Sequence, residues 1–429
     1  MAILLDLGYL LVAIAIFPWF VYRLVLRGDR RGFLQRFGVG LGQGLHASIW
    51  LHGSSAGEIS LLKPLVQLLE RDFPDTQLVI SAYSSTGYAT ASKIFPQHRI
   101  VFFPYDLSVV VWRFLRHFDP LLVVIMESEF WPNFLMASQR SGIPVAFLNG
   151  KMSPQSYQIH AWIRFIPRIL QNVPLMAVQT EEHKQRLQRL GVSAQRVYVT
   201  GNMKYDLAQP PSDLKRPEEL REKLGYRSSD IVIIGGSLHE PEDGALVEAY
   251  KRLSDRPVLT ALIVVPRYPA DAVRFQQRAR ECGCRAVLKT AIDKGESPPG
   301  STGILIVDTV GELIDLYALA DIAFVGGSLF YRGRNKGGHN LMEPAILGVP
   351  ILFGPYNISF KETVDALLGA GAGLMVHDSI ELADALGSLL DSREDRRKMG
   401  IRAHGVIMSH QGATGRNYAL LLSLLKREA

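Results

Sequence analysis

Short apolar runs alternate with amphipathic stretches along most of this chain, and the alternation restricts its fold more than any other feature. In the amphipathic stretches the apolar residues recur at near-helical spacing, as at Ile59, Leu62, Leu65 and Leu69. Strands that alternate with helices form βαβ units, and these units build a mostly parallel sheet. The strands expected in the first half of the chain are 48–51, 78–82, 100–103, 121–126, 145–148 and 175–178.

The same pattern starts again after a proline-rich segment, which indicates a second domain. Residues 207–217 contain Pro210 and Pro211 and end on Pro217, so we expect a linker there. A chain of 429 residues is long enough for two domains. The strands expected in the second half are 231–234, 259–264, 285–288, 304–307, 322–325 and 350–352.

The pattern therefore predicts an α/β protein with two Rossmann-like domains that face one cleft. In doubly wound sheets, ligands bind beyond the carboxyl ends of the strands. The expected divisions are a membrane anchor (1–26), a first Rossmann-like domain (27–206), a linker (207–226), a second Rossmann-like domain (227–405) and a C-terminal helical segment (406–429).

The N-terminus carries an apolar run of the length that crosses a bilayer core. Residues 2–22 include one charged residue, Asp6, near the outer end of the predicted crossing, and Trp19 and Tyr22 stand where an interfacial aromatic belt would lie. A secretory signal has its positive charges before the apolar run, whereas here they follow it, so the rest of the chain is expected in the cytoplasm. A helix that lies in the membrane interface, or one docked on the protein itself, is the alternative. The arginines that follow are Arg23, Arg27, Arg30, Arg31 and Arg36.

The charge balance favours anionic partners. The chain has 47 lysines and arginines against 41 acidic residues, a net charge of +6, which suits nucleic acid, phosphorylated ligands or anionic lipids. The sequence has no nucleic-acid-binding motif, so phosphate and membrane are preferred and no nucleic-acid partner is expected. The two cysteines, Cys282 and Cys284, are expected to be reduced thiols, because two ligands do not make a structural zinc site and a disulfide this short would be strained.

One candidate for chemistry in the first half is the segment His-Gly-Ser-Ser-Ala-Gly-Glu at 52–58, between an expected strand and an expected helix. Glu58 would lie in the first turn of the helix, at the carboxyl end of the strand. There the helix dipole favours the ionised carboxylate, which is the form that a general base requires. The alternative is a glutamate that only caps the helix after a Gly/Ser turn.

Two further segments of the first half are candidates for chemistry: one follows an expected strand, and the other lies just before the linker. Glu127 and Glu129 precede Trp131-Pro132, and a carboxylate there could orient a polyhydroxylated ligand. The alternative is a pair of helix-entry acids before a proline at the first helical position. Lys204, just before the linker, could offset the negative charge that develops on a departing phosphate, or it could be a solvated surface lysine.

Glycine-rich segments in the second half indicate a nucleotide. The residues 326–328 follow an expected strand, and Gly337 and Gly338 lead into an expected helix, whose N-terminal N–H groups suit a phosphate. Glu343, one turn further, could accept hydrogen bonds from a ribose. The alternative is a glycine-rich turn that only lets the chain enter the helix. A G-x-G-x-x-G fingerprint is absent, which disfavours a dinucleotide. Arg267, on a neighbouring loop, could pair with a phosphate or a sugar carboxylate.

Taken in order, these segments make the chain resemble the bacterial 3-deoxy-D-manno-octulosonic acid (Kdo) transferases of lipopolysaccharide synthesis. The combination of Glu-Ser-Glu-Phe-Trp-Pro with Gly-Gly-His-Asn and Glu-Pro is specific to that pattern. The resemblance covers nearly the whole chain, in the segments 52–58, 126–133, 149–153, 200–206, 237–240, 266–267, 308–313, 324–328 and 337–344.

The resemblance implies a GT-B fold, with a lipid acceptor on the first domain and CMP-Kdo on the second, at the cytoplasmic face of the inner membrane. Glu58 matches the family's general base, which deprotonates a hydroxyl of a tetraacyl lipid A precursor so that CMP is displaced with inversion. Glu129 and Lys204 match positions credited with stabilising the transition state. Neither a metal nor another cofactor is implied. The matching CMP-contacting residues are Pro266, Arg267, Val310, Gly311, Glu312, Asn340, Leu341, Met342 and Glu343.

The chain also departs from the family pattern. The residues 332–336 lengthen the loop before Gly337, Pro241 stands where a glycine is usual, and Lys151 stands where an arginine is typical. These differences leave open the number of Kdo units transferred. Another GT-B enzyme that acts on a nucleotide sugar, either a lipid-linked transferase or an epimerase, is the alternative function.

Overall fold

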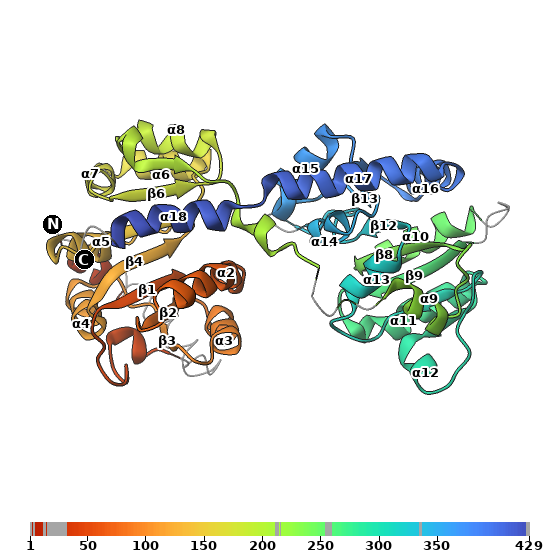
Figure 1. Ribbon diagram of the computed structural model, residues 1–429, viewed down its shortest axis with the longest axis horizontal. Helices are drawn as coiled ribbons and strands as arrows, with labels where there is room; N and C mark the ends of the chain where they lie inside the picture. Colours follow the sequence, from red (N-terminus) through yellow and green to blue (C-terminus); the bar gives the residue numbers. More distant parts are fainter. Residues whose placement is uncertain are drawn as a thin grey trace. The chain divides into compact units, whose positions relative to one another are not determined.

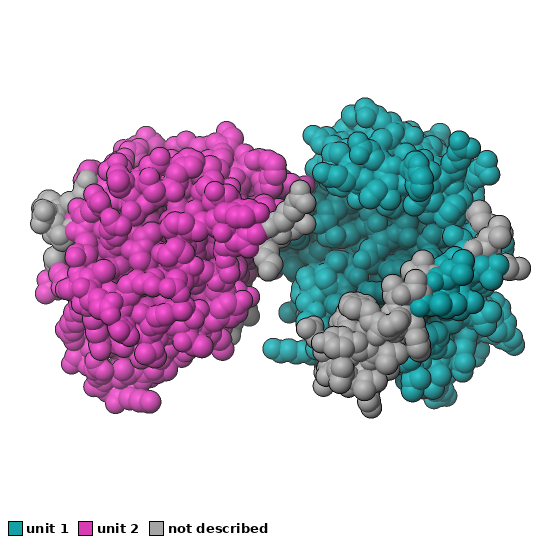
Figure 2. Space-filling model, turned by 180° about the vertical axis from the view of Figure 1, so that it is seen from behind, with its two compact units in different colours: residues 1–207, 411–429 teal, residues 208–410 magenta. Residues whose placement is uncertain are grey.

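A computed structural model describes residues 2, 5–11, 14, 32–210, 214, 216–253, 260–333 and 337–425 of the chain. The chain forms two compact units, coloured separately in Figure 2: unit 1 contains residues 1–207 and 411–429, and unit 2 contains residues 208–410. Each unit is built on one seven-stranded sheet flanked by helices (Figure 1). The α/β fold with two Rossmann-like halves is therefore confirmed.

The strands of unit 1 run parallel in the order β3-β2-β1-β4-β5-β6-β7. A parallel sheet is covered on both faces, so its strands are near-continuous apolar runs. The strands are β1 (Ser48–Gly53), β2 (Leu78–Ala82), β3 (Arg99–Phe102), β4 (Pro120–Met126), β5 (Val145–Gly150), β6 (Leu175–Val178) and β7 (Val197–Val199). The helices and 3-10 turns are η1 (Gln35–Phe37), α2 (Ala56–Asp72), α3 (Ser85–Ile94), α4 (Ser108–Phe118), α5 (Pro132–Arg140), α6 (Pro154–Trp162), α7 (Phe165–Leu170), α8 (Glu181–Arg189), η2 (Ala194–Arg196), η3 (Met203–Leu207) and α18 (Ala413–Leu425).

The strands of unit 2 are also parallel, in the order β10-β11-β9-β8-β12-β13-β14. They are β8 (Ile231–Leu238), β9 (Thr260–Pro266), β10 (Ala286–Leu288), β11 (Ile304–Ile306), β12 (Ile322–Val325), β13 (Ile351–Phe353) and β14 (Gly373–Met375). The helices and 3-10 turns are α9 (Pro217–Lys223), α10 (Glu242–Lys251), η4 (Pro269–Asp271), α11 (Ala272–Glu281), α12 (Lys289–Asp293), α13 (Leu313–Leu319), α14 (Met342–Ile346), η5 (Ile358–Phe360), α15 (Lys361–Gly369), α16 (Ser379–Asp391) and α17 (Arg393–His410).

Each sheet has a switch point, where the chain reverses the direction in which it adds strands. In unit 1 the neighbours β1 and β4 flank this point, and in unit 2 it lies between β8 and β12. Doubly wound sheets bind ligands beyond the carboxyl ends of these strands. The loops that leave β1, β4, β8 and β12 are therefore the places where functional side chains are expected.

Trp50 lies at the centre of one apolar layer of unit 1 and is fully buried. Its indole Nε1 donates a hydrogen bond to Oγ of Ser81 at 2.8 Å, so the polar end of the ring is satisfied. Burying an aromatic side chain of this kind stabilises the fold by about 1.5–3 kcal/mol. The rings that surround it, with centroids 5.3 to 6.0 Å away, belong to Phe103, Phe114, Phe118 and Phe134.

The last helix returns the chain to unit 1. Helix α17 belongs to unit 2, whereas α18, drawn in blue in Figure 1, packs against α2 of unit 1. Tyr418 of α18 donates a hydrogen bond to Oδ2 of Asp72 at 2.6 Å. The chain therefore passes between the units twice, after Leu207 and after His410.

The start of the chain is docked on unit 1. Residues 5–11 are helical, and Asp6 Oδ1 accepts hydrogen bonds from the backbone N–H of Ser108 (3.0 Å) and from Nδ2 of Asn133 (2.8 Å). Tyr9 donates to Oδ2 of Asp106 at 3.1 Å. The prediction that Asp6 lies near the outer end of a membrane crossing is wrong, because these donors at the starts of α4 and α5 hold its charge on the protein.

The predicted anchor is only partly described, and the structure does not show it. Residues 12, 13 and 15–31, with Trp19, Tyr22 and four of the arginines, lie outside the described residues. Across the described ranges, the helices are all too short or too polar to cross a bilayer. Arg36, expected in the basic cluster beside the membrane, is instead buried, with its guanidinium over the rings of Tyr83 and Phe102 at 4.7 and 4.6 Å.

Candidate active-site residues in the two units

The turn from β1 into α2 brings Glu58 to the switch point of unit 1. Gly53 ends β1, and a Cβ atom at this position would approach the backbone and side chain of Glu58 to 3.1 Å. Glycine therefore allows the start of the helix to pack closely on the end of the strand. Ser55 is the N-cap of α2, and its Oγ accepts a hydrogen bond from the Glu58 N–H at 3.3 Å.

The carboxylate of Glu58 bonds back to the turn before α2, in a variant of the capping box. Its Oε2 accepts from the Ser54 N–H at 2.8 Å and its Oε1 from the Ser55 hydroxyl at 2.7 Å. Burial raises the pKa of Glu58, the two hydrogen bonds oppose that shift, and the negative charges of Glu127 and Glu129 add to it. A half-buried carboxylate with a raised pKa is a stronger base than an exposed one, so capping and general-base chemistry are compatible here.

The loop after β4 carries Glu127 and Glu129. Glu127 has a left-handed backbone, with φ of 58°, and its carboxylate pairs with Nζ of Lys151 at 2.9 Å. Asn149, at the end of neighbouring β5, is left-handed too, with φ of 55°. Non-glycine residues rarely adopt this conformation, and such residues gather at functional sites. Trp131 caps α5 and Pro132 is its first residue, so the segment also begins a helix as the alternative interpretation proposed.

A histidine that the sequence pattern gave no role contacts Glu129. His52 is fully buried near the end of β1, and its Nε2 lies 3.3 Å from Oε2 of Glu129. Its Nδ1 faces the carbonyl and hydroxyl oxygens of Ser81 at 3.1 and 3.0 Å, and its ring stacks on Phe103 with centroids 3.9 Å apart. Burial raises the pKa of Glu129, but the hydrogen bond and charge of His52, together with hydrogen bonds from Ser54 and Trp131, lower it by more, so the net shift is downward.

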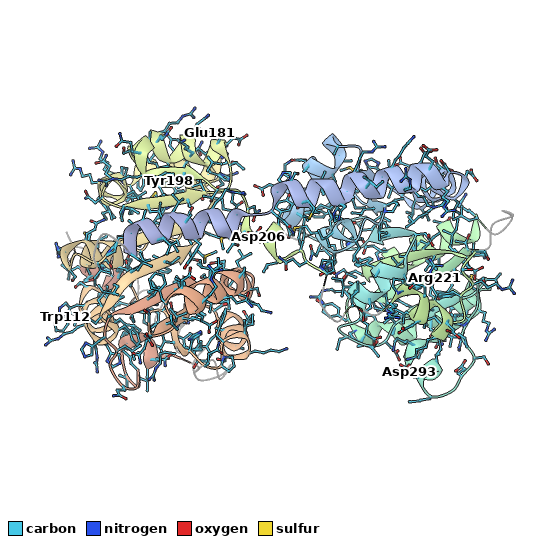
Figure 3. All side chains as sticks on the ribbon, in the orientation of Figure 1. Trp112, Glu181, Tyr198, Asp206, Arg221 and Asp293 are labelled. Atoms are coloured by element: carbon cyan, nitrogen blue, oxygen red, sulfur yellow. The ribbon has the colours of Figure 1, made fainter. Side chains whose placement is uncertain are left out.

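Lys204 lies on the 3-10 turn η3, which is held from two sides. The Met203 N–H donates to Oδ1 of Asn149 at 2.9 Å, which ties the turn to the end of β5. Asp206, labelled in Figure 3, accepts hydrogen bonds from the N–H groups of Gly412 (2.6 Å) and Thr414 (2.5 Å) at the start of α18. The position of Lys204 therefore depends on the C-terminal helix, which sequence spacing could not reveal.

In unit 2, a carboxylate missed by the sequence reasoning organises the switch point. Glu242, in the first turn of α10, has only 1% of its surface exposed. Its Oε2 accepts from the N–H groups of His239 (3.0 Å) and Gly327 (2.7 Å), and its Oε1 from those of Ser328 (2.8 Å) and Leu329 (2.9 Å). One buried anion thus joins the loop after β8 to the glycine-rich loop after β12.

Backbone N–H groups of the glycine-rich segments form hydrogen bonds within the chain. Gly327 donates to Glu242, and the Gly338 N–H donates to the Gly327 carbonyl at 2.6 Å. The Met342 N–H is bonded to Oδ1 of Asn340 at 3.1 Å. Several N–H groups that could have bound a phosphate thus bond within the chain, and α14 has only five residues. Glu343 accepts from Nδ2 of Asn340 at 3.0 Å, and burial raises its pKa.

Two histidines meet beside the glycine-rich segments. Nε2 of His239, after β8, lies 2.8 Å from Nε2 of His339, and the two ring planes are inclined by 20° with centroids 5.0 Å apart. Arg267, directly after β9, donates its backbone N–H to the Leu238 carbonyl at 2.8 Å, so it lies at the same edge of the sheet. The structure thus gathers Arg267 and the residues around His339 at the carboxyl ends of neighbouring strands.

The loop after β11 carries the remaining predicted nucleotide contacts. Val310 is 78% exposed, and Gly311 adopts a left-handed φ of 88°. Glu312 accepts from the Thr309 hydroxyl at 2.8 Å and pairs with Nζ of the buried Lys289 at 3.2 Å. Residues 334–336 of the lengthened loop lie outside the described residues. Within the described ranges, no cluster of three or more His, Cys, Asp or Glu side chains is arranged to hold a metal ion.

The chain is similar to one family of known proteins, both in a family model and in its relatives. The family model of 3-deoxy-D-manno-octulosonic-acid transferase (kdotransferase) matches residues 30–207. A 3-deoxy-D-manno-octulosonic acid transferase of Chlamydia trachomatis serovar D is 32% identical over 352 residues, which cover 81% of this chain and 79% of the relative. Another from Haemophilus influenzae is 29% identical over 382 residues, 88% of this chain and 87% of the relative.

The fold is also similar to that of solved proteins. The UDP-GlcNAc 2-epimerase from Neisseria meningitidis, solved with UDP-GlcNAc, superimposes with a TM-score of 0.58 at 14% identity, covering 88% of this chain and all of that one. An identity this low bears on the fold alone. It supports the arrangement of two Rossmann-like units that the sheets display.

Proposed function

The chain belongs to the 3-deoxy-D-manno-octulosonic acid (Kdo) transferases, and from this membership we propose that it transfers Kdo from CMP-Kdo to a tetraacyl lipid A precursor. The product is a Kdo-substituted lipid A precursor for lipopolysaccharide core synthesis, and CMP is released with inversion at the anomeric carbon. Unit 1 binds the lipid acceptor and supplies the base, and unit 2 binds the CMP-sugar.

The observation that carries the proposal is the position of Glu58 at the switch point of unit 1. Its carboxylate is half-buried, has a raised pKa, and lies close enough to Glu127 and Glu129 for their charges to act on it. An acceptor hydroxyl bonded to Glu58 would lose its proton to this carboxylate while its oxygen attacks the anomeric carbon. A positioned base contributes about 10²–10⁴-fold to such a rate.

Glu129 and Lys204 complete the proposed catalytic group in unit 1. Glu129 stays ionised because its pKa is lowered, so it can stabilise the positive charge that develops at the sugar ring as the donor bond breaks. Lys204 supplies a positive charge for the departing phosphate. Both charges lie on backbone that is held by other elements, Glu129 just before α5 and Lys204 on η3, which keeps them in place without reorganisation.

The donor half uses the loops after β8, β9, β11 and β12. Arg267 pairs with an anionic group of the CMP-sugar, and Glu343, whose Oε1 accepts from Asn340, also accepts hydrogen bonds from the ribose. The cytidine is contacted by Pro266, at the end of β9, and by Val310, Gly311 and Glu312 in the loop after β11. Asn340, Leu341 and Met342 follow Gly337 and Gly338, and this glycine-rich segment lies beside the phosphate, with the Gly338 N–H kept on the Gly327 carbonyl. We propose no metal or other cofactor.

We also propose that unit 1 lies at the cytoplasmic face of the inner membrane. The N-terminal helix docks through Asp6 and Tyr9, while its opposite side exposes an apolar stripe at the spacing of a helix. Trp112 of α4, labelled in Figure 3, is 54% exposed and lies 5.3 Å from the guanidinium of Arg116. Aromatic and basic side chains of this kind suit an anionic interface. The stripe consists of Leu7, Leu10, Leu11 and Ile14.

The decisive experiment is incubation of the purified full chain with CMP-Kdo and the tetraacyl lipid A precursor, followed by mass spectrometry. We expect lipid products heavier by one or more Kdo units, together with CMP. The mass increments count the sugars added. A chain that transfers no Kdo, or that releases UDP from a UDP-sugar instead, would contradict the proposal.

A further inference from the structure

The contact between His239 and His339 constrains their protons. A separation of 2.8 Å between the two Nε2 atoms is that of a hydrogen bond, so one nitrogen donates and the other accepts. One hydrogen therefore lies between the two rings. The acceptor ring carries its own hydrogen on Nδ1, so the neutral pair holds two N–H hydrogens, and one further proton, on Nδ1 of the donor ring, would turn the pair into a cation.

Burial is the largest cause that lowers the pKa of each histidine to about 4. The positive charges of Arg332 and Arg267 lower both pKa values further, and for His339 the charge of His239 does so as well. The ring of Tyr268 lies edge-on to His239 with centroids 5.7 Å apart. Of the acidic groups nearby, Glu242 is bonded to four backbone N–H groups, and Glu240 is paired with Arg274 and Arg278 at 2.7 Å each. At neutral pH the unliganded pair is uncharged.

The pair is also held in place. Glu242 fixes the backbone of His239 and of Gly327, and a Cβ atom on Gly327 would lie 2.6 Å from Cδ2 of His339. Gly327 has a φ of 72°, so glycine is needed there on both grounds. The Gly338 N–H, next to His339, is bonded to the Gly327 carbonyl at 2.6 Å. The two imidazoles therefore meet on a rigid frame.

We propose that the His239–His339 pair takes up a proton when an anionic group of the donor binds beside Arg267 and Arg332. This inference rests on the proposed donor site in unit 2. An anion cancels the field of the two guanidinium groups, which removes one cause that keeps the pair neutral. The resulting imidazolium adds a third positive charge against the anion. The site thus becomes more cationic when it is occupied and returns to neutral when CMP leaves.

The phosphate and the sugar carboxylate of the donor are both anions, so the test must separate them. We would titrate the full chain calorimetrically with the methyl ester of CMP, with free Kdo and with cytidine. A phosphodiester does not titrate near neutrality, unlike the monoester of CMP, whose second pKa is about 6. Each titration is repeated in buffers that differ in ionisation enthalpy, and the slope of the heat against that enthalpy gives the protons taken up.

We expect uptake of up to one proton per ligand with the methyl ester at mildly acidic pH, and none with cytidine. Uptake with free Kdo instead would assign the anion to the carboxylate. The His239→Asn and His339→Asn variants should each lose the uptake, and His377→Asn, which alters an exposed histidine of the same unit, should keep it. The measurement on the unaltered chain is decisive even if a variant fails to fold.

Two results would overturn the inference in different ways. If the methyl ester and free Kdo bind with no proton uptake, the pair is only structural and the donor site stands. If none of the three probes binds to the chain, the donor site proposed for unit 2 falls as well. Unchanged uptake in both the His239→Asn and the His339→Asn variants would place the proton elsewhere and also contradict the assignment.

Discussion

Nε2 of His52 lies 3.3 Å from Oε2 of Glu129, and the side chain of His52 is fully buried. The other ring nitrogen faces two oxygens of Ser81, so both edges of the imidazole are engaged. A carboxylate can only accept, so the hydrogen of this contact belongs to His52. His52 thus orients Glu129 and helps to keep it ionised, so we expect it to act on the proposed reaction through Glu129.

Replacing His52 with phenylalanine should keep the ring stacked on Phe103 but remove the donor to Glu129. A hydrogen bond to a charged group contributes about 1.5–3 kcal/mol, so we expect kcat to fall about 10–100-fold. The pKa of Glu129 should rise, which moves the acid limb of the kcat–pH profile to higher pH. The KM for CMP-Kdo should stay unchanged. His46→Asn, at an exposed site of the same unit, is the control; equal losses in both variants would contradict the role.

The pH dependence of kcat should report Glu58. Its pKa is raised, mainly by burial, and a base acts only when ionised, so kcat should rise with pH through a value above the ordinary range of a glutamate. The Ser55 hydroxyl lowers that pKa. Ser55→Ala should therefore move the limb to higher pH, whereas Ser60→Ala, whose hydroxyl bonds the Ala56 carbonyl on the same helix, should not. A limb at or below the ordinary value would argue against Glu58 as the base.

The hydrogen bonds of Asp206 predict that the C-terminal helix supports catalysis. Asp206→Asn weakens the cap on Gly412 and Thr414 and should lower the free energy of unfolding by about 0.5–2 kcal/mol. Because Lys204 is on the same turn, kcat should fall as well. Asp378→Asn removes a comparable N-cap from α16 in unit 2 and should lower stability without lowering kcat. Equal kcat values in the two variants at a temperature where both are folded would contradict the link.

Much of the fold follows from local pattern, because buried parallel strands are apolar runs that stand out between amphipathic helices. The twelve expected strands correspond to β1–β6 and β8–β13. The edge strands β7 and β14 were missed. Each has three residues, like β10, β11 and β13, but only the first residue of β7 and of β14 is buried, so neither has the character of a fully buried apolar strand.

Less of the candidate site could be predicted, because its contacts join distant residues. Glu58 could be placed from its turn and helix, which are local. The pairing of His52 with Glu129 joins residues 77 positions apart, and that of Glu242 with Gly327 joins residues 85 apart. In the sequence Glu242 is one more acid at the start of a helix. The position predicted for Asp6 was wrong for the same reason, since its partner Ser108 lies 102 positions away.

Membrane association should depend on the apolar stripe of the N-terminal helix. Leu10 and Leu11 are 55% and 69% exposed, so a double change to serine should leave the fold intact. Each buried leucine contributes about 1.5–3 kcal/mol, so binding to vesicles that contain anionic lipid should fall at least tenfold. Val273→Ser, at a site 64% exposed on unit 2, is the control. Sedimentation with vesicles measures the effect, and undiminished binding of the double variant would remove the stripe from the interface.

The last prediction concerns Glu242, whose two oxygens each accept two backbone N–H groups. Glutamine in its place has the same shape but turns an NH2 group toward two of those N–H donors. The variant therefore loses acceptors inside a buried site and sets donors against each other. We expect the free energy of unfolding to fall by about 2–4 kcal/mol, because unsatisfied buried polar groups cost about 1–3 kcal/mol each.

Of the two substrates, Glu242→Gln should affect the binding of the donor CMP-Kdo alone. The carboxylate holds the loop with His239 and the glycine-rich loop after β12, so the KM for CMP-Kdo should rise at temperatures where the variant is folded. The KM for the lipid acceptor should not change, because we propose that unit 1 binds the acceptor. Glu248→Gln, in an exposed ion pair on the same helix, should change neither constant. Equal increases of both KM values in Glu242→Gln would indicate general loosening of the protein, which is not what a clamp on the donor loops predicts.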